Sequence, residues 1–292
     1  MTGENSTQEL SSLEAAYSHC AAFVREHDVD CFIASLFAPD DRRRHLHALY
    51  AYDLEIARIR DLVHEPLPGE IRLQWWRDVL DSGRAGEAAG SPVAMALMDT
   101  VAQCGLPVVP LIAASEARIF DLYEDPMPSL NDLEGYCGET DSALMQLAMI
   151  VLSKGGDPGG GETAGHAGVA IGITRVLTSV TLHMARGQTY VPVDILANYN
   201  INLDRPGKKE RLQAIVPALA ELAEIAHQHL DQARQAARNL SDDVLPALLT
   251  LALVAPRLKR LKSRPLAVDQ PFDDLPQWRR QWLLWRASRR GI

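Results

Sequence analysis

Helical periodicity runs through nearly the whole sequence. Apolar residues recur at intervals of three and four, and no stretch of strict alternation is long enough to predict a strand. Proline and glycine clusters at 65–69, 125–128 and 155–161 mark joints between helical segments. Helices are predicted at 11–26, 42–63, 69–80, 92–103, 108–123, 129–152, 163–184, 209–239, 243–261 and 274–289. The periodicity therefore favours an all-α fold built as a helical bundle.

The composition is typical of a soluble globular chain with a sizeable core. The 292 residues are 47% hydrophobic and 23% charged, and the net charge is −9. Such an acidic chain argues against a nucleic-acid partner, which requires a basic face. The simplest organisation is a flexible N-terminus (1–10), one all-α domain (11–265) and a C-terminal helix (266–292).

No targeting or membrane-spanning signal stands out. The first residues lack a basic segment followed by an apolar run, and the longest apolar run, near 245–255, is too short to span a bilayer. We therefore expect a cytoplasmic location. The four cysteines are far apart and lack metal-binding spacing, so buried free thiols are expected.

Two segments carry a more specific pattern. The first, 39–80, contains P-D-D-R-R-R-H-L-H-A-L-Y-A-Y, I-A-R-I-R-D and R-L-Q-W-W-R-D-V-L; the second, 166–194, ends in R-G-Q-T-Y-V-P-V-D. Between them, 136–145 reads Y-C-G-E-T-D-S-A-L-M. In order and spacing these motifs resemble the squalene/phytoene synthase family, the head-to-head prenyl transferases, over about residues 10–265. The resemblance implies a single-domain, isoprenoid synthase-like helical bundle with a central pocket.

The chemistry of that family depends on two acidic helices. The resemblance implies prenyl diphosphate substrates, whose diphosphate leaves while magnesium ions bridge it to carboxylates. The family places these acids as D-D-x-x-D in the first helix and D-x-x-x-D in the second. Acids four residues apart share one helix face, so each helix presents an acidic patch.

Four of these five acidic positions are replaced in this chain. The first-helix positions fall on Ala57, Arg58 and Asp61, and the second-helix positions fall on Ser179 and His183. The catalytic motifs therefore survive only as relic positions, and no catalytic residue is predicted among them.

The replacements predict that no magnesium site remains, and no cofactor is expected. Leu182 stands where the second helix of the family carries a further acid, and the histidine at 183 suits zinc or iron better than magnesium. Arg58 brings a positive charge that repels magnesium, although with Arg60 it can instead hold a phosphate group. Magnesium enters only if the chain is an active prenyl transferase.

Ligand-binding residues are predicted where the family lines or supports its pocket. The candidates are Arg43, Tyr50, Arg58, Asp61, Trp76, Arg77, Tyr136, Arg186 and Tyr190. Each group has a structural alternative. The aromatic residues can fill the core, the arginines at 42–44 can pair with acids at the helix start, and Asp61 can pair with a neighbouring cation. His183 is expected to be a packed histidine. His227 and His229 lie two apart on a helix, so they point different ways and are not expected to form a site.

The replacements match one branch of the family, which is related to a mitochondrial respiratory complex I assembly factor. That branch also has an acid-poor first helix, followed by patterns that read here as V-H-E-P (63–66) and L-Q-W-W-R-D (73–78). Its element resembling Y-x-E-N/G-T-x-S-x-L is matched by Tyr136, Glu139, Thr140, Ser142 and Leu144, and its H-A-G/S-x-A-x-G-I element is matched at 166–173. The resemblance implies that the fold was kept while the metal chemistry was lost.

The C-terminal segment combines tryptophan with arginine. Trp278, Trp282 and Trp285 are spaced to share one helical face, and five arginines but no acid follow from Gln277 onward. This combination is typical of a helix at a membrane surface, which would attach the protein peripherally to the inner membrane. The alternative is a terminal helix that docks on the bundle by its tryptophans.

Together the patterns favour a non-enzymatic assembly or scaffold factor for a membrane respiratory complex of the complex I type. Its expected partners are a respiratory-complex subunit or assembly partner, a lipid or prenyl diphosphate in the former pocket, and a membrane surface. The alternative is an active prenyl transferase that condenses farnesyl or geranylgeranyl diphosphate head to head. A third hypothesis is a binder of prenyl diphosphate or phospholipid that performs no chemistry.

Overall fold

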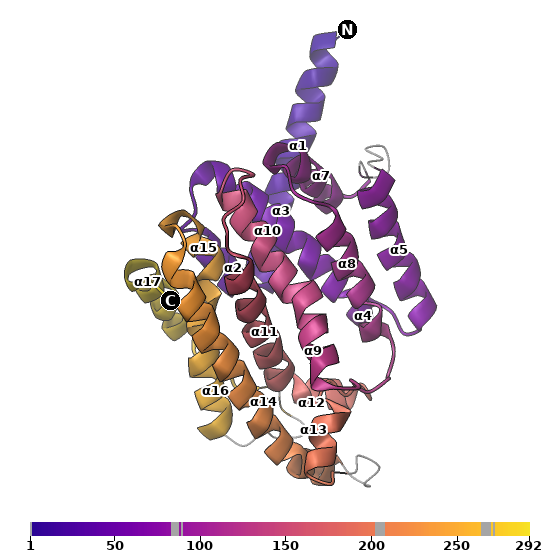
Figure 1. The fold of residues 1–292 in the computed structure, drawn as a ribbon. Helices are drawn as coiled ribbons and strands as arrows, with labels where there is room; N and C mark the ends of the chain where they lie inside the picture. The colour runs from indigo at the N-terminus through magenta and orange to yellow at the C-terminus, as the bar shows by residue number, and fades with distance from the viewer. Residues whose placement is uncertain (1, 83–87, 89, 202–207, 264–269, 271) are drawn as a thin grey trace. The chain divides into compact units, whose positions relative to one another are not determined.

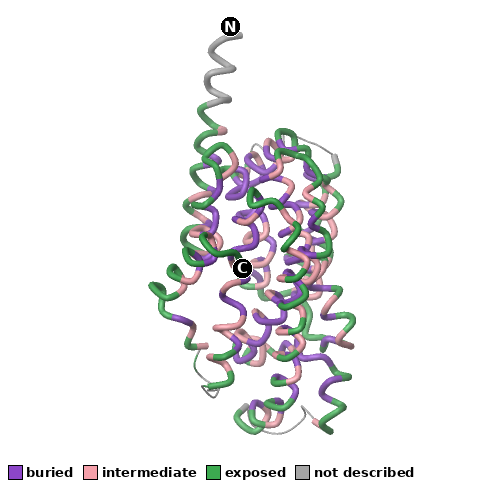
Figure 2. Tube along the Cα trace, turned by 60° about the vertical axis from the view of Figure 1, so that its left-hand side comes forward, coloured by how far each residue is buried: buried purple, intermediate pink, exposed green. Residues whose placement is uncertain are grey.

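The computed structural model describes residues 2–82, 88, 90–201, 208–263, 270 and 272–292. Every regular element in these ranges is helical, and none is a strand. Figure 2 shows buried and exposed stretches alternating along the helices, as expected for amphipathic segments. The predicted all-α fold is therefore confirmed.

Packing divides the chain into two compact units, which are described separately. Unit 1 contains Met1–Leu122, Ala143–Gly159 and Leu240–Leu248, and unit 2 contains Tyr123–Ser142, Gly160–Asn239 and Leu249–Ile292. Because each unit is assembled from three separate segments, no single cut of the chain separates them, in keeping with the single domain predicted. The C-terminal helix, which was predicted as a segment of its own, belongs to unit 2.

Unit 1 is built around α3 (Asp40–Ala57), which is buried at every position from 45 to 52. Its neighbours are α1 (Thr2–His27), α7 (Pro92–Cys104) and α10 (Ala143–Leu152). The remaining elements are α2 (Val29–Ser35), α4 (Ile59–Leu62), α5 (Pro66–Ser82), α8 (Val109–Ala117), η1 (Phe120–Leu122), η4 (Asp242–Val244) and α15 (Leu245–Leu248). A helix buried on all sides lies in the core, so α3 organises this unit.

Helix α1 is longer than predicted. It begins at Thr2, so it includes most of the segment 1–10 that the sequence predicted to be flexible. The helix is fixed by buried side chains further along, among them Tyr17, Cys20 and Val24. Once such a segment is helical, further residues join it without a new nucleation step, which explains the extension.

Unit 2 is built around α11 (Gly161–Thr178) and α14 (Lys208–Ala236), which pack along each other and lie side by side in Figure 1. Helix α11 also contacts α9 (Leu130–Cys137) and α16 (Val254–Ser263). The other elements are the π-helix η2 (Gly138–Ser142), α12 (Val180–Ala185), α13 (Val193–Asn198), η3 (Ala237–Asn239), η5 (Leu249–Leu253) and α17 (Gln277–Arg290).

Several helices predicted as continuous are interrupted. The segment 108–123 divides into α8 and η1, and the segment 243–261 divides into η4, α15, η5 and α16. The segment 42–63 breaks at Arg58, which joins α3 to α4, and the segment 163–184 breaks at Ser179, which joins α11 to α12. The segment 129–152 contains the π-helix η2 between α9 and α10. Before the second break, the Thr178 hydroxyl donates to the carbonyls of Thr174 and Arg175, a local hydrogen bond that commonly bends helices. Periodicity alone does not register such breaks, because the apolar spacing continues through them.

Candidate functional site

The first relic motif lies in unit 1, at the joint between α3 and α4. Ala57 ends α3, Arg58 has φ −89° and ψ −3°, and Asp61 is exposed on the short helix α4. The Arg58 guanidinium lies 5.4 Å from the ring centre of Phe23, a cation–π contact with α1. Its charge also offsets the effect of burial, which raises the pKa of Glu55. The structure therefore engages Arg58 with groups of the protein itself.

The second relic motif lies in unit 2, at the joint between α11 and α12. Ser179 forms the joint, and Leu182, at the position of the further family acid, is 48% exposed. His183 is half-buried, and its ring centre lies 4.5 Å from that of Tyr190. Burial, reinforced by the positive charges of Arg175 and Arg186, lowers the pKa of His183 to about 4. The imidazole is therefore neutral near pH 7 and packs against an aromatic ring, as expected for a packed histidine.

An ion pair one turn before Ser179 dominates the electrostatics of this region. Arg175 on α11 donates from Nη1 and Nη2 to the two carboxylate oxygens of Asp141, at 2.8 and 2.7 Å. The Asp141 side chain is 7% exposed and also accepts a hydrogen bond from the Thr140 hydroxyl at 3.1 Å. Such a bidentate pair is strong and directional. Arg175 thereby neutralises the buried carboxylate of Asp141.

Two glycines of α11 allow the π-helix to come close enough for this pair. A Cβ at Gly172 would lie 2.5 Å from the Cys137 sulfur and 2.8 Å from Asp141 Oδ2. A Cβ at Gly168 would lie 2.2 Å from the backbone nitrogen of Ser142. The elements matched at 136–144 and 166–173 are therefore one packing unit, in which small residues on α11 accept the irregular turn. Single π turns of this kind often occur at functional sites.

Two of the predicted ligand-binding residues meet at the end of α12. Tyr136 and Tyr190 are both buried, with ring centres 5.9 Å apart. Arg186 caps α12, and Gly187 follows with φ 77°, a backbone conformation that favours glycine. The segment after it is fixed by backbone hydrogen bonds between Met127 and both Thr189 and Val193. Of the predicted candidates, the structure thus brings Tyr136, Tyr190 and Arg186 into one region with His183.

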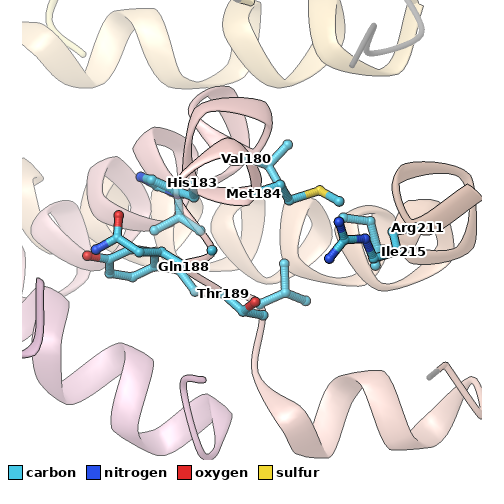
Figure 3. Close-up of a pocket in the computed structure, with 11 residues that line it drawn as sticks. Val180, His183, Met184, Gln188, Thr189, Arg211 and Ile215 are labelled. Atoms are coloured by element: carbon cyan, nitrogen blue, oxygen red, sulfur yellow. The ribbon is translucent and has the colours of Figure 1, made fainter. Parts of the chain in front are cut away.

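A small pocket opens beside these residues (Figure 3). It is lined by Val176, Val180, His183, Met184, Gly187, Gln188, Thr189, Tyr190, Val191, Arg211 and Ile215. Its volume is about 50 Å³, room for a few water molecules at ~10–15 Å³ each. Pockets for small ligands typically measure ~300–1,000 Å³. This pocket is therefore too small for a prenyl chain, and the central pocket implied by the resemblance stays a prediction.

The candidates in unit 1 contact other parts of that unit. Arg43 donates to the carbonyls of Ser35, Leu36 and Ala38 and thereby secures the turn before α3. Trp76 is 2% exposed and packs edge-on against other aromatic rings.

Tyr50 and Arg77, the remaining ligand-binding candidates of unit 1, are also engaged within the protein. Tyr50 is buried, and burial holds the pKa of its hydroxyl well above the usual range. Arg77 contacts Gln74 and Glu116. These contacts support the structural alternatives, and a ligand-binding role for these residues stays a prediction.

A second polar cluster in unit 2 was not predicted from the sequence. His166 Nδ1 and His229 Nδ1 are 3.0 Å apart, and His229 Nε2 lies 3.3 Å from Glu134 Oε1. The expectation that His227 and His229 do not form a site together holds, since His227 contacts the carbonyl of Ala223. However, His229 finds its partner 63 positions away, on α11, which no spacing rule reveals.

Residues suited to hold a metal do not gather at the relic positions. In the described part of the chain, no group of three or more His, Cys, Asp or Glu side chains is arranged to hold a metal ion. The cysteines in these ranges are free, as predicted; Cys20, Cys104 and Cys137 are buried, whereas Cys31 is half-buried and departs from that prediction. No thiol joins Asp61 or His183 in a potential ligand set.

The comparison with known families decides the identity of the fold. A family model described as squalene/phytoene synthase matches residues 24–286. The chain belongs to the squalene/phytoene synthase family. That match covers the positions predicted as relic motifs and reaches into α17.

Similar proteins fall into two groups. The assembly factor 6 of NADH dehydrogenase (ubiquinone) complex I from Rattus norvegicus is 26% identical over 88% of this chain and 77% of that protein. The protein of the same name from Homo sapiens is 25% identical over 87% and 76%. The 15-cis-phytoene synthase of Synechococcus elongatus is 24% identical over 94% of this chain and 92% of that protein.

Solved structures of the family share the fold. A dehydrosqualene synthase superimposes with a TM-score of 0.81 at 14% identity, covering 96% of this chain and 98% of that one. A squalene synthase from Alicyclobacillus acidocaldarius gives 0.69 at 20% identity, covering 97% and 98%. The predicted isoprenoid synthase-like fold is confirmed.

Proposed function

We propose that this squalene/phytoene synthase-family protein is a non-catalytic assembly factor for a membrane respiratory complex of the complex I type. In this proposal it has no magnesium-dependent activity and works at the surface of the inner membrane. A respiratory-complex subunit or another assembly factor is its protein partner. A lipid or isoprenoid bound to the fold is compatible with this role but is not needed for it.

The observation that carries the proposal is the replacement of the acids in both relic motifs. Magnesium bound to a diphosphate requires carboxylates around it. The first motif offers an arginine engaged with Phe23 and one exposed acid, Asp61. The second offers Ser179 and the neutral His183, one turn after an arginine that is committed to Asp141. Neither motif supplies a cluster of carboxylates.

The relatives support the biological half of the proposal. The matches named as complex I assembly factor 6 cover more than four fifths of this chain, so the likeness is not confined to one motif. No helix in the described part of the chain is long and apolar enough to cross a membrane.

An active prenyl transferase is the second candidate. It is favoured by the family fold and by the likeness to a 15-cis-phytoene synthase along most of both chains. Fold alone is a weaker argument than the residues at the site, because one fold can host several functions.

The deciding experiment has a cellular and a chemical arm. In the cellular arm, the gene is deleted in its native host, and membranes are assayed for assembled NADH:quinone oxidoreductase on native gels and by activity. We expect loss of the assembled complex, with rescue by the wild-type gene and by Asp61→Ala. Normal assembly in the deletion strain would refute the assembly role.

In the chemical arm, the pure protein is incubated with farnesyl or geranylgeranyl diphosphate, Mg²⁺ and NADPH. We expect no diphosphate release above a protein-free control. Release that disappears in Asp61→Ala would instead establish the prenyl transferase and exclude the non-catalytic reading.

A further inference from the structure

Helix α17 (Gln277–Arg290) attaches to unit 2 by one narrow side. Leu284 and Ala287 are the buried residues of this helix, at 0% and 4% exposure, and the helix packs on η5 (Leu249–Leu253). On the same side, Arg280 reaches the carboxylate of Asp274 at 4.0 Å. Figure 1 shows α17 at the outer edge of the helices of its unit. The docking side therefore uses a leucine, an alanine and one arginine, but none of the tryptophans.

The tryptophans lie on the side turned away from the unit. Trp278, Trp282 and Trp285 are 69%, 48% and 52% exposed. Their i, i+4 and i+7 spacing places them along one face of the helix. The predicted alternative, a terminal helix docked by its tryptophans, is therefore wrong. Tryptophan carries the largest apolar surface of any side chain, and three neighbouring exposed rings usually mark an interaction surface.

Arginines flank this row of rings. Arg279, Arg286, Arg289 and Arg290 are all exposed, and the Arg286 guanidinium lies 5.4 Å from the ring centre of Trp282. Near α17, ion pairs engage Arg257, Arg260 and Arg280 with Asp273 and Asp274. None of the ion pairs found in the described part of the chain involves Arg279, Arg286, Arg289 or Arg290. The exposed side of α17 therefore combines apolar rings with uncompensated positive charge, on a protein whose net charge is −9.

We infer that the exposed side of α17 binds the surface of a bilayer that contains anionic phospholipid. The helix lies parallel to the membrane, its tryptophan rings enter the boundary between head groups and acyl chains, and its arginines contact lipid phosphates. This inference extends the membrane attachment in the proposed function by assigning it to a surface and to a lipid class.

The charge distribution favours an anionic lipid surface over a second copy of the chain as the binding partner of α17. A second copy of the chain would bring four more arginines against the first four, and like charges oppose such pairing. The acidic remainder of the protein is repelled by anionic lipid, so attraction is confined to this helix and fixes the orientation of the protein. A polybasic segment gains about 5-fold in membrane affinity for each basic residue near an anionic surface.

Vesicle binding of the full chain tests the inference. The protein is sedimented with vesicles of phosphatidylcholine alone and of phosphatidylcholine mixed with phosphatidylglycerol. We expect binding to the mixed vesicles at least tenfold stronger than to the neutral ones, and weaker at high salt. The triple variant Trp278→Ser, Trp282→Ser, Trp285→Ser is expected to lose at least tenfold. The variant with Arg279, Arg286, Arg289 and Arg290 changed to Gln should lose the preference for phosphatidylglycerol.

A matched control uses exposed apolar residues elsewhere. Leu67 and Ile71 on α5 are 65% and 62% exposed, so Leu67→Ser with Ile71→Ser removes exposed apolar surface without touching α17. This variant should bind the mixed vesicles like the wild type. Because all the substituted side chains are exposed, circular dichroism and thermal midpoints should match the wild type and show that each variant is folded.

Three outcomes would overturn the inference: equal binding to both vesicle types, unchanged binding by the tryptophan variant, or a concentration-dependent dimer that the tryptophan variant abolishes. These outcomes are independent of the assembly assay. If vesicle binding fails while the deletion strain lacks the complex, only the lipid surface is wrong. If vesicles bind while assembly is normal, only the assembly role is wrong.

Discussion

Arg175 and Asp141, 34 positions apart in the sequence, form a bidentate ion pair with nitrogen–oxygen distances of 2.8 and 2.7 Å. The pair joins α11 to the π-helix η2, one turn before Ser179. The family resemblance predicts an acid at position 179 in an active enzyme. Here position 179 is a serine, and the buried carboxylate of Asp141 is already paired with Arg175.

The ion pair should matter for stability more than for activity. Arg175→Gln leaves a nearly buried carboxylate without its cation, which costs about 3–5 kcal/mol for a fully buried pair. Since the Arg175 side chain is 40% exposed and solvent screens it, we expect a smaller loss of about 1–3 kcal/mol in the free energy of unfolding. Urea unfolding measures this loss.

The exposed pair between Arg234 and Asp231 provides the control for this measurement. Arg234→Gln should cost less than about 0.5 kcal/mol. The ion pair would be unimportant if the two variants were equally stable.

Gly172→Ala tests the close approach of α11 and the π-helix. The new methyl would meet the Cys137 sulfur at 2.5 Å, so we expect a loss of about 1–3 kcal/mol in the free energy of unfolding. Gly165→Ala is the matched control on the same helix, because a Cβ there meets nothing within 4 Å. That substitution should stabilise by about 0.5–1 kcal/mol. Opposite signs for the two glycines are the expected result, and equal effects would contradict the packing described.

Asp61→Ala should behave as a surface change. Asp61 is exposed, and a substitution there should alter the free energy of unfolding by no more than about 0.5 kcal/mol. Asp53→Ala provides the contrast within the same segment. Asp53 pairs at 3.3 Å with Arg118, whose side chain is 5% exposed, so its removal should cost about 1–3 kcal/mol. A large cost at Asp61 would show that the last relic acid retains a structural role.

Stability should fall in mildly acidic solution because of His47. Burial, helped by the charge of Arg43, lowers the pKa of His47 to about 4, and its Nε2 lies 2.8 Å from the Ser35 hydroxyl. A histidine with a depressed pKa in the folded state stabilises the protein fully above the unfolded pKa of about 6.5 and loses this contribution as pH falls toward 4. The loss amounts to about 2–3 kcal/mol.

Urea unfolding at a series of pH values measures this dependence. His47→Gln should reduce it by the share of His47, and the remainder includes the share of His183, whose pKa is also lowered to about 4. Nuclear magnetic resonance of the imidazole provides an independent check. Titration of the folded-state ring near its ordinary pKa would refute the prediction.

Several features of the fold and site were accessible from the sequence because their signals are local. Helical periodicity predicted the ends of α7 within one residue and those of α17 within three, since amphipathic spacing and terminal prolines act over a few positions. The order of the motifs predicted the family. The replaced acids at 57, 58, 179 and 183 could be read directly, because the motif endings fix the count.

Other features depended on contacts between distant residues. The breaks at Arg58 and Ser179 leave the apolar spacing intact, so the pattern could not reveal them. His229 was set aside by its spacing from His227, yet its partner is His166 on another helix. The glycines at 168 and 172 could be recognised as part of a motif in the sequence. That they allow η2 to pack closely against α11 could be seen only in the structure.

The sequence by itself determined that this chain is all-helical, that it follows the squalene/phytoene synthase pattern, and that it lacks most of that family's acids. These are properties of residue type and spacing along one chain segment. Only the tertiary structure decided that Arg175 is committed to Asp141 and that α17 packs by Leu284 while its tryptophans remain exposed. The physical reason is that side-chain partners and burial are set by which helices pack together, and local periodicity leaves that choice open.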